Sequence, residues 1–198
     1  MQKRASVLEL QSASLTLLGN FNPFIISPDW LKATGIWEAK DLHLSLGSTG
    51  GAGVQFYGDG TDWRVTAERL VITSMYSDCG LLAEKILDAL PHTPMVAVVF
   101  HFVFQAPSDA TDTVFSVIRQ AIKPATGAEL LRWGTVFHRD NARIDVAFVT
   151  GTEGTTVSSS HRRAARTAGV AKDAVKNFSN DKRQASELVS QMIRAARP

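Results

Sequence analysis

Apolar and polar residues alternate along the first third of the chain with the two-residue period of half-exposed β-strands. Residues 6–18 follow this alternation, and it returns in 37–46, 53–57 and 62–73. Glycine-rich turns separate these later segments, as is typical of strands joined by hairpins. The pattern predicts a long first strand followed by an antiparallel meander.

Between the first two strands, the sequence Ser27-Pro28-Asp29 predicts the start of a short helical turn, because proline is favoured at the first helical position. Residues 78–90 have apolar side chains at helical spacing, with Asp78 as the N-cap. The run from Met95 to Phe104 is almost entirely apolar. A short run of this kind predicts a central strand that is covered on both faces.

The second half of the chain continues the mixture of helix and strand. The spacing predicts a helix over 108–122, a hairpin of 130–138 with 142–150, and a last helix from Arg183 to Ala196. Residues 155–160 predict only a weak edge strand. The order of these elements indicates a segregated α+β fold, in which two or three helices pack against a mostly antiparallel sheet.

Composition agrees with one folded domain spanning residues 1–198. The 198 residues are 44% hydrophobic and 20% charged, which is ordinary for a globular protein and unlike a disordered chain. The chain has no apolar run long enough to cross a membrane and no continuous signal-peptide core. We therefore expect a soluble cytoplasmic protein without membrane association.

Charge is distributed unevenly although the net charge is only +2. From Gly151 onward nine basic and four acidic residues give +5, whereas residues 1–150 carry −3. The basic segment, residues 151–198, includes Arg162, Arg163, Arg166, Lys172 and Lys176. These five residues are the candidate site for a polyanion such as nucleic acid. A solvated surface, or a patch for an acidic protein, is the alternative explanation.

Residues with catalytic or metal-binding chemistry are scattered. No pair of the five histidines has the local spacing of metal ligands, and Cys79 is the single cysteine. We predict no metal site and no cofactor. Cys79 lies at a helix start without a neighbouring base, which favours a structural role over a nucleophilic one.

The loop after the first strand contains the most unusual local composition. Asn20, Phe21, Asn22 and Phe24 follow one another closely, and Trp30 comes soon after. Loops rich in aromatic and amide side chains often bind a partner. The alternative is that the aromatic rings close the end of the sheet while the amides satisfy turn backbone.

Two segments, LLGNFNPFIISPDWL (17–31) and LPHTPMVAVVF (90–100), resemble a group of uncharacterised bacterial proteins. In that group an Asn-Pro…Pro-x-Trp segment follows the first strand, and a His-Thr-Pro turn introduces a central apolar strand. The resemblance implies a bacterial or phage-related origin and the α+β fold. It implies no activity and no site residue.

The sequence thus favours a non-catalytic interaction or assembly subunit that binds a protein partner or a second copy of itself. One alternative is a nucleic-acid-binding accessory protein that uses the basic segment. A further alternative is an enzyme whose site is assembled from distant polar residues such as His101, His138 and Asp140.

Overall fold

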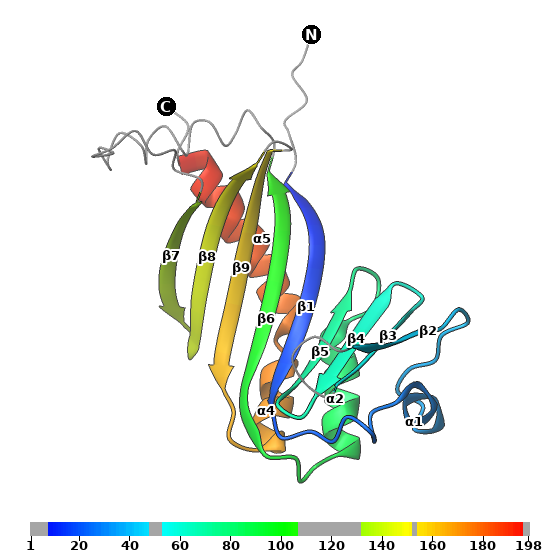
Figure 1. Cartoon of the computed structure of the whole chain (residues 1–198). Coiled ribbons are helices and arrows are strands. Elements are labelled where there is room, and N and C mark those ends of the chain that lie inside the picture. The colour runs from blue at the N-terminus through cyan, green and yellow to red at the C-terminus, as the bar shows by residue number, and fades with distance from the viewer. Residues whose placement is uncertain (1–7, 48–52, 107–131, 152–153, 196–198) are drawn as a thin grey trace.

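One antiparallel sheet of nine strands runs through the molecule (Figure 1). The computed structural model describes residues 8–47, 53–106, 132–151 and 154–195. The strands are β1 (Glu9–Gly19), β2 (His43–Gly47), β3 (Gly53–Gly58), β4 (Thr61–Thr66), β5 (Arg69–Ser74), β6 (Met95–Ala106), β7 (Arg132–Arg139), β8 (Ala142–Gly151) and β9 (Gly154–Ala164). The helices are α1 (Pro28–Ala33), α2 (Cys79–Ala89), α4 (Ala168–Val175) and α5 (Phe178–Ala195). The predicted α+β class is therefore confirmed.

The strand order across the sheet is β2-β3-β4-β5-β1-β6-β9-β8-β7. The predicted meander is the run β2 to β5, and β6 lies between β1 and β9 as its apolar composition predicted. The predicted cover on both faces of β6 is not found among the described residues, because Val99, His101 and Val103 on one face are only half-buried. Along β6, Phe100, Phe102 and Phe104 are fully buried on one face. The rings of Phe100 and Phe102 contact the ring of Phe178 in α5, with centroids 5.3 and 5.4 Å apart. Burial of each of these side chains stabilises the fold by about 1.5–3 kcal/mol.

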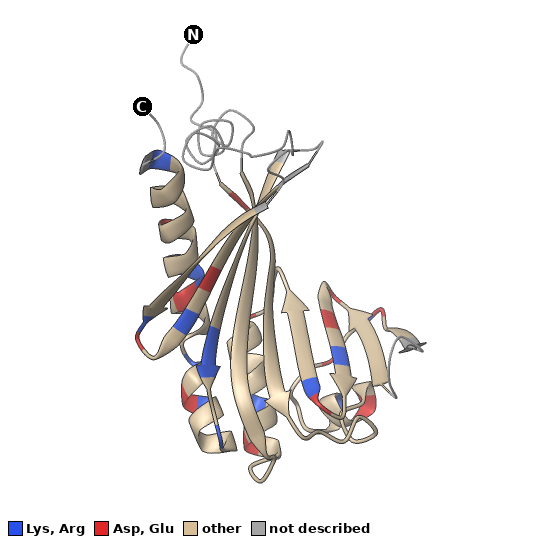
Figure 2. Cartoon of the chain, turned by 60° about the vertical axis from the view of Figure 1, so that its left-hand side comes forward, with Lys and Arg blue, Asp and Glu red and all other residues tan. Residues whose placement is uncertain are grey.

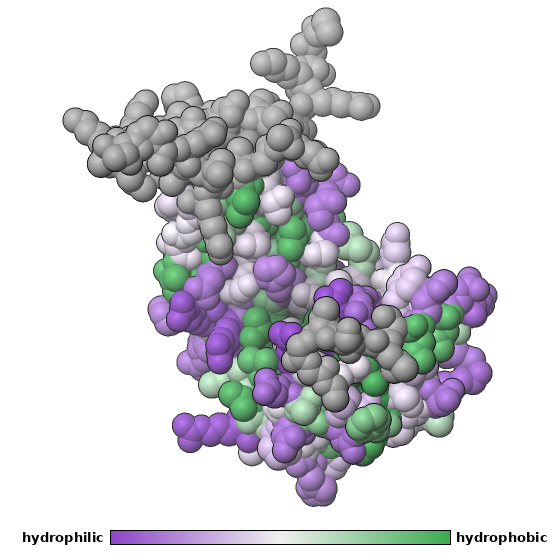
Figure 3. Space-filling view, viewed as in Figure 1, coloured by the Kyte–Doolittle hydropathy of each residue, from purple (hydrophilic) through white to green (hydrophobic). Residues whose placement is uncertain are grey.

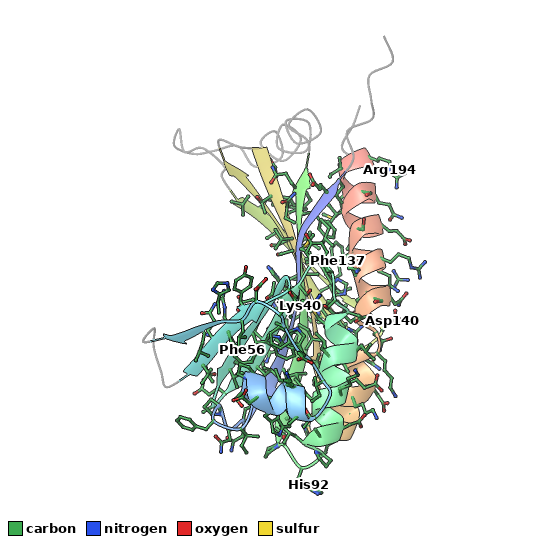
Figure 4. The ribbon with its side chains drawn as sticks, turned by 90° about the vertical axis from the view of Figure 1, so that its right-hand side faces the viewer. Lys40, Phe56, His92, Phe137, Asp140 and Arg194 are labelled. Carbon is green, nitrogen blue, oxygen red and sulfur yellow. The ribbon has the colours of Figure 1, made fainter. Side chains whose placement is uncertain are left out.

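Helices α2, α4 and α5 cover this apolar face, whereas no described helix covers the opposite face. Figure 4 views the sheet from the β2 side and shows the helices standing along one side of it, with Arg194 near one end of α5 and His92 at the far end of the molecule. The uncovered side, which we call the open face, carries half-buried polar residues on its central strands, among them Ser14, His101 and Ser160. Figure 3 looks onto this open face and shows hydrophilic side chains gathered where the β7–β8 hairpin ends.

Two predicted helix starts are confirmed by their caps. Ser27 Oγ accepts the Trp30 N–H at 3.3 Å at the start of α1. Asp78 Oδ1 accepts the Gly80 and Leu81 N–H groups at 2.8 and 3.2 Å at the start of α2. Each capping side chain pairs backbone donors that the helix leaves free.

Several predicted boundaries were wrong. Residues 62–73 form two strands, β4 and β5, joined by a turn. The predicted edge strand over 155–160 is the interior strand β9, paired with both β6 and β8. The last helix begins at Phe178 instead of Arg183, and α4 precedes it. The helix predicted over 108–122 lies outside the described residues. No helix in the described part of the chain is long and apolar enough to span a bilayer.

Candidate functional site

The aromatic loop divides between the core and the surface. Phe21 is buried and Trp30 packs partly buried against the core, whereas Phe24 is 81% exposed. Asn20 and Asn22 are exposed. Asn22 Oδ1 accepts the Phe24 N–H at 3.0 Å, which fixes a local turn. The loop therefore does not present its five candidate residues as one surface, and its predicted role in partner binding stays a prediction.

The five candidate residues of the basic segment are also divided. Arg163 pairs with Asp181, Lys172 lies 2.6 Å from Asp88, and Lys176 lies 3.2 Å from Asp173. Arg162 and Arg166 have no ion pair or side-chain hydrogen bond among the described residues. Three of the five candidate residues are thus paired locally, and Arg162 is the member that joins another cluster of basic residues.

A polar network lies buried between β9 and α5, and sequence reasoning missed it. The Arg163 guanidinium donates to both carboxylate oxygens of Asp181, with the Nη2–Oδ1 distance 3.0 Å. Nδ1 of His161 lies 3.3 Å from Asp181 Oδ2 without hydrogen-bond geometry, and its Nε2 lies 3.0 Å from Ser159 Oγ. The alternation of Ser159, His161 and Arg163 along one strand was the available signal, because it places all three on one face.

Serine, histidine and aspartate in this order resemble the arrangement of a hydrolase triad. Ser159, however, is fully buried, and His161 and Asp181 are each 1% exposed. A nucleophile needs access to its substrate, which Ser159 Oγ does not have. We therefore interpret the network as a tether that holds α5 on the sheet.

Of the three residues proposed for a dispersed active site, His138 and Asp140 line one cavity, whereas His101 lies apart from them. His101 lies near the middle of the open face, where its Nδ1 is 2.7 Å from Ser160 Oγ, and burial lowers the pKa of His101 below its ordinary value. His138 is on β7, separated from β6 by β9 and β8. Three strand spacings amount to roughly 14 Å. Asp140 is in the β7–β8 turn, where its carboxylate lies 3.4 Å from Arg139.

Cys79 is fully buried at the start of α2, and its Sγ lies 3.8 Å from the Ala13 carbonyl oxygen. Burial raises the pKa of the Cys79 thiol to about 12. A thiol of this kind is not a nucleophile at neutral pH. The side chain therefore fits the structural role that the sequence favoured.

Basic residues gather on the open face where the β7–β8 hairpin ends beside β9. In the sheet register, His138 of β7 lies opposite Arg143 of β8, and Arg143 lies opposite Arg162 of β9. Figure 2 shows basic positions beside one another on these neighbouring strands. Together with Arg139 they line a cavity of about 610 Å³, which we call the basic cavity. Its volume is within the range of small-ligand sites.

The strand β7 forms one edge of the sheet. No strand among the described residues pairs with its outer side. Its register with β8 runs without a bulge from Arg132 to Arg139. The side chains of Val136 and Phe137 are 48% and 37% exposed. We call this the β7 edge.

A second cavity, of about 530 Å³, lies on the helix face between the β7–β8 hairpin and α5. Phe137, Ile144 and Leu188 give it an apolar wall, and buried His161 lies beside it. We call it the helix-face cavity. The end of β7 is therefore flanked by a basic cavity on one face and a partly apolar cavity on the other.

Among the described residues, no group of three histidine, cysteine or acidic side chains is placed to hold a metal ion. No protein-family model and no curated protein matches this chain. Its function is therefore inferred from the geometry of the β7 edge and the two cavities.

Proposed function

We propose that the protein is a non-catalytic interaction subunit that binds a partner protein along the β7 edge. The observation that supports this is the regularity of the edge. Its eight residues, Arg132–Arg139, stay in register with β8 and contain no proline, lysine or carboxylate. Natural edge strands use such residues, or bulges, to resist pairing. An edge without them favours the addition of an extended segment through backbone hydrogen bonds.

The arginine at the end of β7, Arg139, sets a first requirement on the partner segment. A segment with an acidic residue near the matching end would complement its charge.

The helix-face cavity adds a second requirement on the partner segment. Side chains of an added strand alternate between the two faces of the sheet. Those on the helix face would meet the apolar wall formed by Phe137, Ile144 and Leu188. We infer that the bound segment alternates apolar side chains toward this cavity with polar side chains toward the open face.

The arrangement of polar groups also supports binding over catalysis. The serine–histidine–aspartate network is buried, and His101 and His138 are separated by two strands. Neither arrangement brings a nucleophile and its base to an accessible cleft, which is the minimum that acyl-transfer chemistry requires.

The proposal is tested by capturing the partner from the cells that make this protein and then blocking the edge. The full chain is tagged and captured at moderate salt with and without nuclease, and bound proteins are identified by mass spectrometry. Thr135→Pro and Val136→Pro are compared with the unmodified chain. Successive N–H groups of an edge strand point alternately to the neighbouring strand and to solvent. One of the two variants therefore removes an outward N–H without breaking the β7–β8 ladder.

We expect the variant that keeps the unmodified melting temperature to lose at least tenfold in partner affinity. The other variant serves as the control for damage to the sheet, because its melting temperature falls. Unchanged capture by the stable variant would exclude the β7 edge as the binding surface. Loss of the complex on nuclease treatment would instead favour the nucleic-acid alternative.

A further inference from the structure

The basic cavity carries more positive charge than its neighbouring residues neutralise. Three arginines and one aspartate line it, namely Arg139, Arg143, Arg162 and Asp140. Asp145 lies on β8 next to Arg143 and accepts N–H groups of that guanidinium at 3.0–3.3 Å. Arg162 lies directly opposite Arg143 and has no acidic partner in the described part of the chain.

This arrangement costs stability in the absence of a ligand. Cross-strand neighbours interact strongly because their side chains lie close together, and two cations in such a pair repel each other. Folding gains nothing from placing Arg162 opposite Arg143. Residues whose placement lowers the stability of the fold are expected mainly at functional sites.

The geometry of the groups identifies the ligand chemistry. A guanidinium presents N–H donors in a planar fork that matches the oxygens of a phosphate group. Arg143 and Arg162 are directly opposite in register, and side chains so placed can contact one multiply charged group together. His138 lies beside Arg143 in register and supplies a third donor. We propose that the basic cavity binds a compact, phosphate-bearing anion through Arg143 and Arg162.

A compact anion fits this surface better than a nucleic-acid strand. A strand needs a track of cations along its backbone. Of the other four candidate residues of the basic segment, Arg163, Lys172 and Lys176 are paired with Asp181, Asp88 and Asp173, which leaves Arg166 to extend such a track from Arg162. The cavity is open to solvent, and its volume of about 610 Å³ is within the range of small-ligand sites.

The test is a thermal-shift and calorimetric titration of the full chain with inorganic tripolyphosphate at low salt. The double variant Arg143→Gln/Arg162→Gln is compared with the unmodified chain. Arg64→Gln is the matched control, because Arg64 is exposed on the same face and pairs with Asp62 two residues away, as Arg143 does with Asp145. In register Arg64 lies opposite Gln55 and Val71 and therefore faces no second cation.

We expect tripolyphosphate to raise the melting temperature of the unmodified chain and of the Arg64 variant. The affinity of the double variant should be at least tenfold lower, and added salt should weaken binding to the unmodified chain. Without ligand, the double variant should melt at the same or a higher temperature, because the repulsion between the two arginines is gone. A purely structural role for these arginines predicts that the double variant melts at a lower temperature than the unmodified chain.

Three results would overturn the proposal. They are no shift with millimolar tripolyphosphate, equal affinity in the double variant, and binding of single-stranded oligonucleotides that strengthens with length beyond the affinity for tripolyphosphate. A mononucleotide triphosphate is titrated beside tripolyphosphate, and tighter binding of the nucleotide would identify a nucleoside as part of the ligand. Because the titration uses no protein partner, its outcome is independent of the β7 edge proposal.

Discussion

At the residue scale, the carboxylate of Asp181 is buried between α5 and β9, where it contacts Arg163 and His161. Burial by itself raises the pKa of a carboxyl group, but the contacts with His161 and Arg163 outweigh it and hold the pKa of Asp181 below its ordinary value. The ionised form is therefore the one that the folded protein stabilises.

We expect Asp181→Asn to lower the free energy of unfolding by about 3–5 kcal/mol, because it leaves the Arg163 charge uncompensated in a mostly buried site. The measurement is urea unfolding at pH 7. The control is Asp173→Asn, which breaks an exposed ion pair with Lys176 and should cost less than about 1 kcal/mol. Similar losses in both variants would contradict the proposed tether between α5 and β9.

The lowered pKa of Asp181 also predicts how stability depends on pH. A carboxyl group whose pKa is lower in the folded state contributes stability that is present above its unfolded pKa, near 3.8. This contribution is lost as pH falls through the folded pKa. We expect the stability difference between the unmodified chain and Asp181→Asn to be constant above about pH 5 and to shrink below about pH 4. A difference that stays constant as pH falls below about 4 would assign the loss to packing instead of charge.

Single residues were the hardest level to predict from sequence. The helix start at Ser27-Pro28-Asp29 and the cap Asp78 were predicted because the signals of a helix start act over about three residues of local sequence. The contact of Asp181 with His161 and Arg163 joins segments 18–20 residues apart, and it depends on how α5 lies on β9. Periodicity shows which face of an element a residue occupies, but it does not show what lies across from that face.

At the scale of elements, the start of α2 lies unusually close to the end of α4 and the start of α5. A Cβ atom on Gly80 would lie 2.6 Å from the Val175 carbonyl oxygen and 2.8 Å from Phe178 Cβ. Asp78 strengthens the same junction, since its Oδ2 accepts the Ser179 hydroxyl at 2.7 Å. The absence of a side chain at Gly80 thus allows the helices to meet.

We expect Gly80→Ala to destabilise the fold by about 1–3 kcal/mol, as overpacking of a core contact does. Gly169→Ala in α4 is the control, because no atom other than Thr167 Oγ1, at 4.0 Å, lies near its Cβ position. Alanine there should stabilise the helix by up to about 1 kcal/mol. Thermal unfolding measures both, and opposite signs are expected. A neutral Gly80→Ala would show that the helices can separate without cost.

Elements with a clear two-residue or helical period were predicted, whereas β9 was mistaken for an edge. Its segment is rich in serine and threonine, which suggested an exposed strand. The strand is interior because Ser159 and His161 are buried on its helix face, where Asp181 and Ser159 supply polar contacts to His161. A buried polar residue that finds its partner on a distant helix gives no apolar signal in its own sequence.

At the scale of the whole molecule, side chains are more deeply buried at the centre of the sheet than at its edges. The helix-face residues at the middle of β1 and β6, such as Leu15, Leu17 and Phe100, are fully buried, whereas β2 at one edge leaves Leu44 58% exposed. We expect amide hydrogens of β1 and β6 to exchange slowest and those of β2 fastest, because opening at an edge exposes less apolar surface. Exchange measured by mass spectrometry after proteolysis checks this ranking. Equal protection in β2 and β6 would contradict it.

The position of β1 has a consequence for how the chain is made. β1 lies between β5 and β6, both of which follow it in the chain. A ribosome releases β1 about fifty residues before its first neighbour and more than seventy before its second, judging from paired positions such as Leu17 with Leu70 and Val98. During that interval β1 has no native strand to pair with, and its apolar side chains stay uncovered. Such segments are prone to aggregate. The nascent protein is therefore most vulnerable early in translation and gains protection once β6 has emerged.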